Sequence, residues 1–393
     1  MYRKTFLVLL LGWISMGTAF AGGGVVSVVK KVGRFLDTMA VSGVDQNYIV
    51  APRRPWQIIA RGNVNQSDLK LKSTIHNTED AIFFMKGDSH WEPRIKTDPS
   101  TYVGVWGGYR GYGLGYSWNV GGDKGRILTF GATGGSYGVN LRIHWFENDE
   151  PELSADGTML DLSGSGSGNV PFSFSEVAKT ESPVKTRALF LDGYYLFNGK
   201  RCSYAAAYDQ SVIQKRSAGS LMAGAMYFHQ TTHYDEPENA DIIFFMNDVG
   251  RFKTWQVSAG VGYIYNWVPA KGLLVSAMAI PMVTFYNHTK VWRYDSDLKD
   301  RLLDPENGVS FLSDLIDGTD NFKGGLREAA VDPVISDNSK VTVNVDARLS
   351  LTYQWNRYFI NAYGQFMSFR YQMDDLSGRL NDWYVYASAG VRL

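Results

Sequence analysis

The sequence predicts an all-β protein, an antiparallel transmembrane β-barrel of about 12 strands with a short N-terminal periplasmic helix. Three observations support this fold class. Long segments alternate between apolar and polar residues, the composition is rich in aromatic residues and glycine, and short connections alternate with long ones. The chain contains 23 Tyr, 21 Phe, 11 Trp and 41 Gly in 393 residues, which suits a barrel with aromatic girdles. A barrel of about 14 strands is the alternative if residues 57–64 and 68–75 enter the wall as separate strands.

The clearest predicted strand covers residues 341–355. Its odd-numbered residues are apolar and its even-numbered residues are polar, a period of two that places the two kinds on opposite faces of a strand. Asp346 and Arg348 fall near the middle of the polar face, where contact with lipid would be costly. We therefore expect the polar face to line the lumen. Tyr353 and Trp355 end the apolar face, as expected for an aromatic band at a membrane interface.

The remaining wall strands are predicted from similar alternation between turn signals. Besides one early strand before Tyr102, they cover residues 102–109, 112–120, 126–133, 137–147, 186–198, 218–233, 252–267, 273–285, 358–372 and 383–393.

The lengths of the connections support the same architecture. With the C-terminus placed in the periplasm, the short connections at 134–136, 268–270 and 356–357 fall on the periplasmic side. The long connections fall outside, as in outer-membrane barrels: residues 148–185, 234–251, 288–340 and 373–381. The connection 199–217 is the exception, because it falls on the periplasmic side and is too long for a turn.

The N-terminal region predicts export. Residues 1–21 combine a basic start, an apolar core and Ala19-Phe20-Ala21, which is typical of a signal peptide. A membrane anchor helix is the alternative, but the apolar core is too short to span a bilayer. Residues 22–56 are predicted as a periplasmic helix and linker, with the barrel at 57–393. The helix has a basic face, by which it would lie on the membrane surface, or it would pack under the barrel as a cap.

Charged residues on the polar phase of the strands are candidates for lining the lumen. They are Arg142, His144, Asp192, Asp346, Arg348 and Arg370. Two interpretations stay open: the charges form a network that fills a narrow barrel, or they line a channel.

A metal site is weakly indicated by His229, His233 and Asp235. The segment is predicted as a strand, in which the two histidines share a face but lie about 13 Å apart at 3.3 Å per residue. They would bind one ion only if the strand ended between them, so we expect no metal and no cofactor.

The alternation along the strands does not place a set of catalytic groups on one face. His229 lies on the apolar phase of its strand, whereas Ser220 and Ser258 lie on the polar phase, so no Ser–His pair emerges. Cys202 is the single cysteine and is expected to be buried rather than reactive.

The function indicated is a non-enzymatic channel or structural surface protein of the cell outer membrane. A lipid-modifying enzyme is one alternative, and a surface binding module using the acidic loops near 147–152 and 235–238 is another. Expected partners are outer-membrane lipids and the barrel-assembly machinery. Without the signal peptide the acidic residues exceed the basic ones by two, and this near-neutral charge indicates no nucleic-acid partner. The oligomeric state stays open.

Two separated motifs resemble a known family. The first includes Asp45, Tyr48, Arg54, Pro55 and Trp56, and the second includes Lys215, Arg216, Ser217 and Gly219. Together they resemble the family called domain of unknown function 4421. The resemblance implies an exported outer-membrane β-barrel of a Gram-negative bacterium. It implies no activity and no catalytic residue. Cys202 stands where the family pattern leads us to expect an aromatic residue, a small departure.

Overall fold

The computed structural model describes most of the chain from residue 43 onward. The described residues are 43–75, 89–122, 124–160, 169–177, 182–239, 242–243, 246, 249–296, 310, 326–328, 334–337, 341–372 and 376–393. The predicted signal peptide and the predicted helix at 22–40 lie outside these residues, so both stay predictions.

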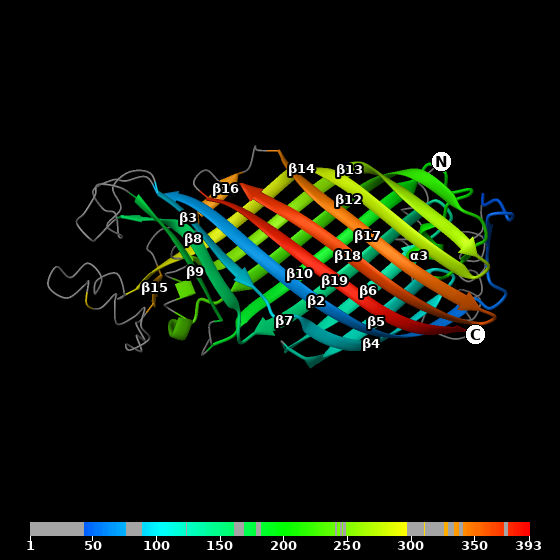
Figure 1. Ribbon diagram of the computed structural model, residues 1–393, viewed down its shortest axis with the longest axis horizontal. Helices are drawn as coiled ribbons and strands as arrows, with labels where there is room; N and C mark the ends of the chain where they lie inside the picture. The colour runs from blue at the N-terminus through cyan, green and yellow to red at the C-terminus, as the bar shows by residue number, and fades with distance from the viewer. Residues whose placement is uncertain are drawn as a thin grey trace, which may run out of the picture.

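Twelve antiparallel strands close into a barrel (Figure 1). β2 pairs with β19 on one side and with β4 on the other, which closes the ring. The wall strands are β2 (Trp56–Ile75), β4 (Ser100–Tyr109), β5 (Tyr112–Gly121), β6 (Lys124–Thr133), β7 (Tyr137–Asn148), β10 (Val184–Leu196), β12 (Ala218–His233), β13 (Val249–Ala270), β14 (Leu273–Ser296), β17 (Thr342–Trp355), β18 (Tyr358–Gln372) and β19 (Leu376–Arg392).

The predicted strand number is therefore confirmed. The alternative of about 14 strands is wrong, because the two weak early segments form the single 20-residue strand β2. The polar residues that separate them in sequence lie within this strand rather than in a turn.

Further strands extend the sheet beyond the barrel at the end with long connections, here called the loop end. β3 (Ser89–Lys96), β8 (Glu152–Leu160) and β9 (Asn169–Val177) continue from β2. β15 (Leu326–Glu328) and β16 (Val334–Asp337) pair with β14. Of these, β8, β9, β15 and β16 lie in segments predicted as long connections, because their alternation is weak in sequence and they depend on pairing to neighbours. β3 lies before the strand predicted from Tyr102, in a segment for which no strand is predicted.

Tight turns join the strands at the opposite end, here called the turn end, where the C-terminus also lies (Figure 1). Arg110 and Gly111 have φ angles of 52° and 91°. A two-residue hairpin turn whose twist matches that of its strands requires positive φ at both positions. The turn predicted at 268–270 is displaced. β13 continues to Ala270, and Gly272 makes the turn because its φ of 83° is easily adopted only by glycine.

The predicted alternation in the strand at 341–355 is confirmed. Within β17, even-numbered residues from Thr342 to Thr352 are buried in the barrel. Leu349 is 63% exposed on the outside, whereas Arg348 beside it is 3% exposed. Exposed aromatic side chains gather near the turn end, as in a membrane girdle: Trp56, Tyr195, Phe197, Tyr263, Tyr265, Trp267, Tyr353, Trp355 and Tyr358.

The core of the protein lies inside the barrel. Toward the loop end Phe190, Phe228 and Phe369 form an aromatic layer, in which Phe228 and Phe369 stack with ring centroids 4.0 Å apart. None of the helices that the structure describes has the length and apolar character needed to span a membrane.

The exposed apolar wall predicts a depth-dependent response to charge. Leu349→Arg near the middle of β17 should destabilise the barrel by about 2–4 kcal/mol, because the guanidinium would face hydrocarbon. The matched control Val341→Arg, before the same strand, should cost about 0–1 kcal/mol. Urea unfolding in lipid vesicles measures both, and equal costs would contradict the assignment of the outer face to lipid.

Candidate functional site

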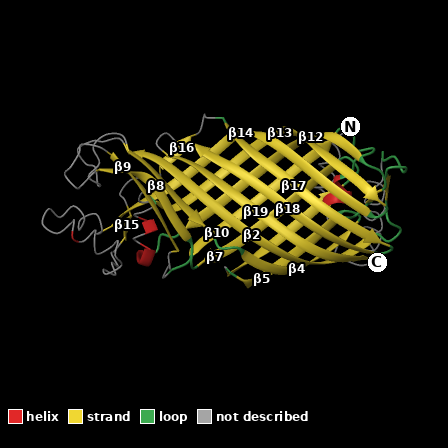
Figure 2. Cartoon of the chain, in the orientation of Figure 1, coloured by secondary structure: helices red, strands yellow, loops and turns green. Residues whose placement is uncertain are grey.

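Residues 199–217, the plug segment, turn into the barrel at the turn end. The segment contains α3 (Tyr204–Tyr208), and every residue of this helix is buried. Ser203 caps the helix by accepting a hydrogen bond from the Ala206 amide at 3.1 Å. Figure 2 shows α3 near the end that holds the C-terminus. The connection that was too long for a turn therefore fills the lumen.

Side chains of the wall hold the plug segment through its backbone carbonyls. The Ser350 hydroxyl donates to the Ala207 carbonyl at 2.6 Å, and the Arg392 guanidinium donates to the Gln210 carbonyl at 2.8 Å. The Asn266 amide donates to the Ser203 carbonyl at 2.8 Å. These contacts come from β17, β19 and β13, so they attach the plug segment to the arc of the wall between β13 and β19.

The segment before the barrel closes over the plug segment. β1 (Ile49–Val50) pairs with β11 (Ile213–Gln214), and the Asp45 amide donates to the Lys200 carbonyl at 2.8 Å. The Lys215 amide donates to the Tyr48 carbonyl at 2.7 Å. The Tyr48 ring lies near Arg201 and Arg216, 5.2 and 5.8 Å from their guanidinium carbons. The two family motifs thus meet in space.

The other motif residues join the linker to the wall. The backbones of Trp56 and Leu393 exchange hydrogen bonds of 3.3 and 2.9 Å, and the Pro55 carbonyl accepts from the Arg110 amide. The Ser217 hydroxyl accepts from the Val268 amide at 2.9 Å.

Two motif residues remain, Gly219 and Arg54. The Gly219 carbonyl accepts from the Asn198 side chain at 2.9 Å. Arg54 is exposed.

Arg348 is the centre of a buried ionic network. Its guanidinium contacts Asp346 at 2.6 Å on its own strand and Asp192 of β10 at 3.0 Å. It also donates to the Tyr204 hydroxyl of the plug segment at 2.5 Å. The Gln365 amide donates to Asp346 at 3.1 Å. One cation therefore joins two parts of the wall to the plug.

A second ion pair lies in the same region of the lumen. Arg142 of β7 contacts Asp382 of β19 at 2.5 Å. Its guanidinium also lies over the rings of Phe190 and Tyr384, at 4.3 and 4.6 Å. The Asn140 amide, two residues before Arg142 on the same strand, donates to Asp192 of the first network at 2.7 Å.

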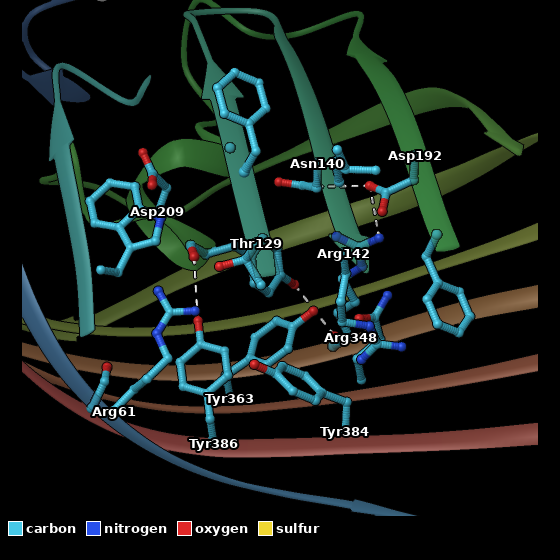
Figure 3. Close-up of a pocket in the computed structure, with 18 of the residues that line it drawn as sticks. Arg61, Thr129, Asn140, Arg142, Asp192, Asp209, Arg348, Tyr363, Tyr384 and Tyr386 are labelled. Carbon is cyan, nitrogen blue, oxygen red and sulfur yellow. Dashed lines mark hydrogen bonds and ion pairs between the residues drawn. The ribbon is translucent and has the colours of Figure 1, made fainter. Parts of the chain in front are cut away.

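A small cavity lies beside this network and is lined both by network residues and by residues of the plug segment (Figure 3). Its volume is about 110 Å³, and its lining includes Arg61, Asp209, Gln210 and Tyr386. Since a water molecule occupies about 30 Å³ in the liquid, the cavity has room for a few waters.

Five of the six predicted lumen residues face the lumen: Arg142, His144, Asp192, Asp346 and Arg348. His144 lies apart from the network and shares a 2.9 Å hydrogen bond with the Tyr102 hydroxyl. The sixth, Arg370, is exposed, because the odd-numbered residues of β18 face the lumen and its even-numbered ones face outward.

Asp382, Asn140 and Tyr204 belong to the network but are not among the six predicted lumen residues. Asp382 precedes the outward-facing Trp383, so the strand phase alone identifies it as a lumen residue. Nothing in the sequence places Tyr204 opposite Arg348, because the plug segment lacks a strand period.

The weak metal candidates do not converge. The His229 ring stacks on Trp255 with centroids 5.1 Å apart. His233 lies 3.4 Å from Asp235, whose carboxylate is already bound by Arg251 at 2.7 Å and Tyr294 at 2.6 Å. In the described part of the chain no group of three metal-ligating side chains gathers.

Nucleophiles and bases are likewise separated within the described residues. Ser258 faces the lumen, where its hydroxyl pairs with Thr284 at 2.9 Å, whereas the His229 Nδ1 pairs with the Thr254 carbonyl at 2.8 Å. Cys202 is fully buried, and burial raises the pKa of its thiol to about 12, which keeps it protonated and unreactive.

Removing the central cation should be costly. Arg348→Met leaves Asp346 and Asp192 as buried carboxylates without their cation, so the free energy of unfolding should fall by about 3–5 kcal/mol. Urea unfolding of the refolded barrel measures the loss. The exposed Arg370→Met is the control and should change stability by less than about 0.5 kcal/mol. A loss for Arg348→Met no larger than the control's would contradict a structural role for the network.

Asp209 at the end of α3 should make stability depend on pH. Burial raises the pKa of this carboxyl, although hydrogen bonds from Ser211 and Thr133 and the nearby Arg61 oppose the rise. The folded protein therefore binds the proton more tightly than the unfolded chain. Stability should fall as pH rises from about 4 through the folded pKa. Asp209→Asn should flatten this part of the profile of urea midpoint against pH, and Asp149→Asn is the exposed control. An unchanged profile would show that Asp209 does not cause the dependence.

Comparisons with solved structures give weak similarities. The beta domain of the Bordetella autotransporter BrkA is 11% identical, with a TM-score of 0.26, and the match covers 85% of this chain and 100% of that one. The outer-membrane protease OmpT from Escherichia coli is 8% identical, with a TM-score of 0.34 and coverage of 86% and 97%. The P. putida toluene transporter TodX is 9% identical, with a TM-score of 0.26 and coverage of 91% and 94%. At these values the similarities indicate nothing about activity.

The sequence comparisons are more specific. No curated protein matches the chain. A family model described as a domain of unknown function, DUF4421, matches residues 45–392, from Asp45 of the first motif to Arg392 of the last strand. Because this match covers most of the sequence, the chain belongs to the DUF4421 family.

Proposed function

We propose that this protein is a non-enzymatic channel of the cell outer membrane whose lumen is closed at rest by its own plug segment. Outer-membrane placement is supported by the exposed apolar wall, the aromatic girdle, and the contrast between short turns and long connections. In this placement the turn end, with the plug segment, faces the periplasm.

The main support for the closed state is the position of α3 in the lumen. All five of its residues are buried, and the segment is attached to the wall by hydrogen bonds from Ser350, Arg392 and Asn266. Individual hydrogen bonds contribute about 0.5–1.5 kcal/mol net, so a few of them form an attachment that can be released. A plug that is held by a few releasable hydrogen bonds supports a gating function better than a purely structural one.

The composition of the lumen supports the same function. A barrel that served only as a scaffold gains as much stability from apolar filling as from buried ion pairs. This chain instead places Arg348 and Arg142 with their carboxylates beside the plug segment. Removal of the plug would expose these charges to water from the turn end and leave the aromatic layer as the remaining obstacle.

Conductance in planar bilayers tests the proposal. The wild-type barrel should be silent. A variant with Asn266→Ala, Ser350→Ala and Arg392→Gln weakens the attachment of the plug, and the added changes Phe228→Ala and Phe369→Ala remove the aromatic layer that would still obstruct the path. This variant should show discrete conductance steps, because both obstacles have been weakened.

Heat-modifiable gel mobility shows whether each variant is folded. The aromatic changes alone are the matched control and should leave the barrel closed, because the plug segment stays attached. A folded but silent combined variant would support a structural role and contradict the channel. Conductance of the wild type would contradict closure by the plug segment.

A further inference from the structure

We infer that the outer face of β6, β7 and β10 binds the phosphate of a membrane lipid at the loop end of the barrel. A cleft of about 520 Å³ opens there. Most of its lining side chains lie on the outward phase of their strands, including Lys124, Arg126, Trp145, Lys185 and Arg187.

Two arginines flank one tryptophan in this cleft. Trp145 of β7 pairs in register with Arg126 of β6 and with Arg187 of β10. The guanidinium carbons of Arg126 and Arg187 lie 5.1 and 5.6 Å from the centroid of the Trp145 ring. The ring therefore holds both cations on neighbouring strands, which reduces the conformational freedom that binding would remove.

Both guanidiniums are free for a ligand. The two side chains are exposed, and within the described residues neither forms an ion pair with a carboxylate. Arginine at such a position can hold a phosphate through two parallel N–H···O hydrogen bonds.

The other charges around the cleft are largely balanced. Lys124 lies 3.4 Å from Asp149, Lys185 lies 3.7 Å from Glu236, and His233 lies 3.4 Å from Asp235. Glu147 stands between Lys124 and Lys185 in the register of β6, β7 and β10. The surplus positive charge thus belongs to Arg126 and Arg187, on the side of the cleft nearer the apolar wall.

The wall below the cleft is suited to acyl chains. The next outward row toward the turn end consists of Leu128, Ile143 and Leu189, which pair in register on the same three strands. The row after it consists of Phe130, Leu141 and Leu191. A phosphate site directly above an apolar surface fits a phosphorylated lipid better than a free anion, because headgroup and chains are both matched.

Cations also lie over tryptophan rings at the loop end of β13 and β14, where Arg251 is 5.5 Å from the Trp292 ring and Lys253 is 4.8 Å from the Trp255 ring. At the loop end of β17 the outward residues are Val341 and Val343, both exposed. Arg251 is already paired with Asp235 at 2.7 Å, so Trp145 differs in being flanked by two arginines that have no carboxylate partner among the described residues.

Lipid retention by the refolded barrel tests the inference, which rests on the proposed membrane placement. The probe is bisphosphorylated lipid A, with its dephosphorylated form as the comparison, and native mass spectrometry from a zwitterionic detergent measures the bound fraction. The wild type should retain the phosphorylated form in preference. The double variant Arg126→Gln and Arg187→Gln should weaken its binding by about tenfold or more, because two charge-assisted contacts are lost. Lys271→Gln, an exposed cation at the turn end, should have no effect.

The results that would contradict the inference can be told apart from one another. Equal retention of the two lipid forms, or equal binding by the double variant, would overturn the phosphate site. If inorganic phosphate at the same concentration as the lipid displaces all of the lipid, the cleft is a general anion site and the proposed lipid ligand is wrong. A failure of the membrane placement itself would appear separately, as absence of heat-modifiable mobility in the wild type and in every variant.

Discussion

The contact of Arg348 with Asp346 and Asp192 is the interaction on which the interior of this barrel depends. A buried guanidinium is tolerable only with carboxylates in good geometry, and here they come from β17 and β10, on different parts of the ring. The remaining donor of Arg348 contacts Tyr204, so the same cation also positions the plug segment. The wall and its filling are thereby fixed by one charge.

The plug segment solves a geometric problem of a twelve-strand barrel. The wall encloses more space than its own inward side chains fill. Without the plug segment, inward side chains of the wall would lose packing and hydrogen-bond partners. α3 supplies buried aromatic and small side chains at the turn end, and the aromatic layer around Phe228 packs inside the barrel toward the loop end. β1 then covers the plug segment by pairing with β11, which explains why motifs far apart in sequence belong together.

Much of the wall is predictable because each strand has one face toward lipid and one toward the lumen. The strand at 341–355, with Leu349 outside and Arg348 inside, shows this directly. The prediction was wrong where the phase was not followed through β18, so that Arg370 was assigned to the lumen. It was also wrong at the turn near 268–270, because a proline inside β13 resembled a turn signal although Gly272 makes the turn.

The sequence by itself determined the barrel, a wall of about twelve strands and most of the residues that face inward, because the period of two along each strand depends only on the neighbouring residues of that strand. Tertiary structure alone decided that the plug segment enters the lumen, that Asp192 reaches Arg348, and where Tyr204 lies. These depend on the curvature of the ring and on a segment without a repeating pattern, so the partners are separated by more than a hundred residues and meet only when the barrel closes.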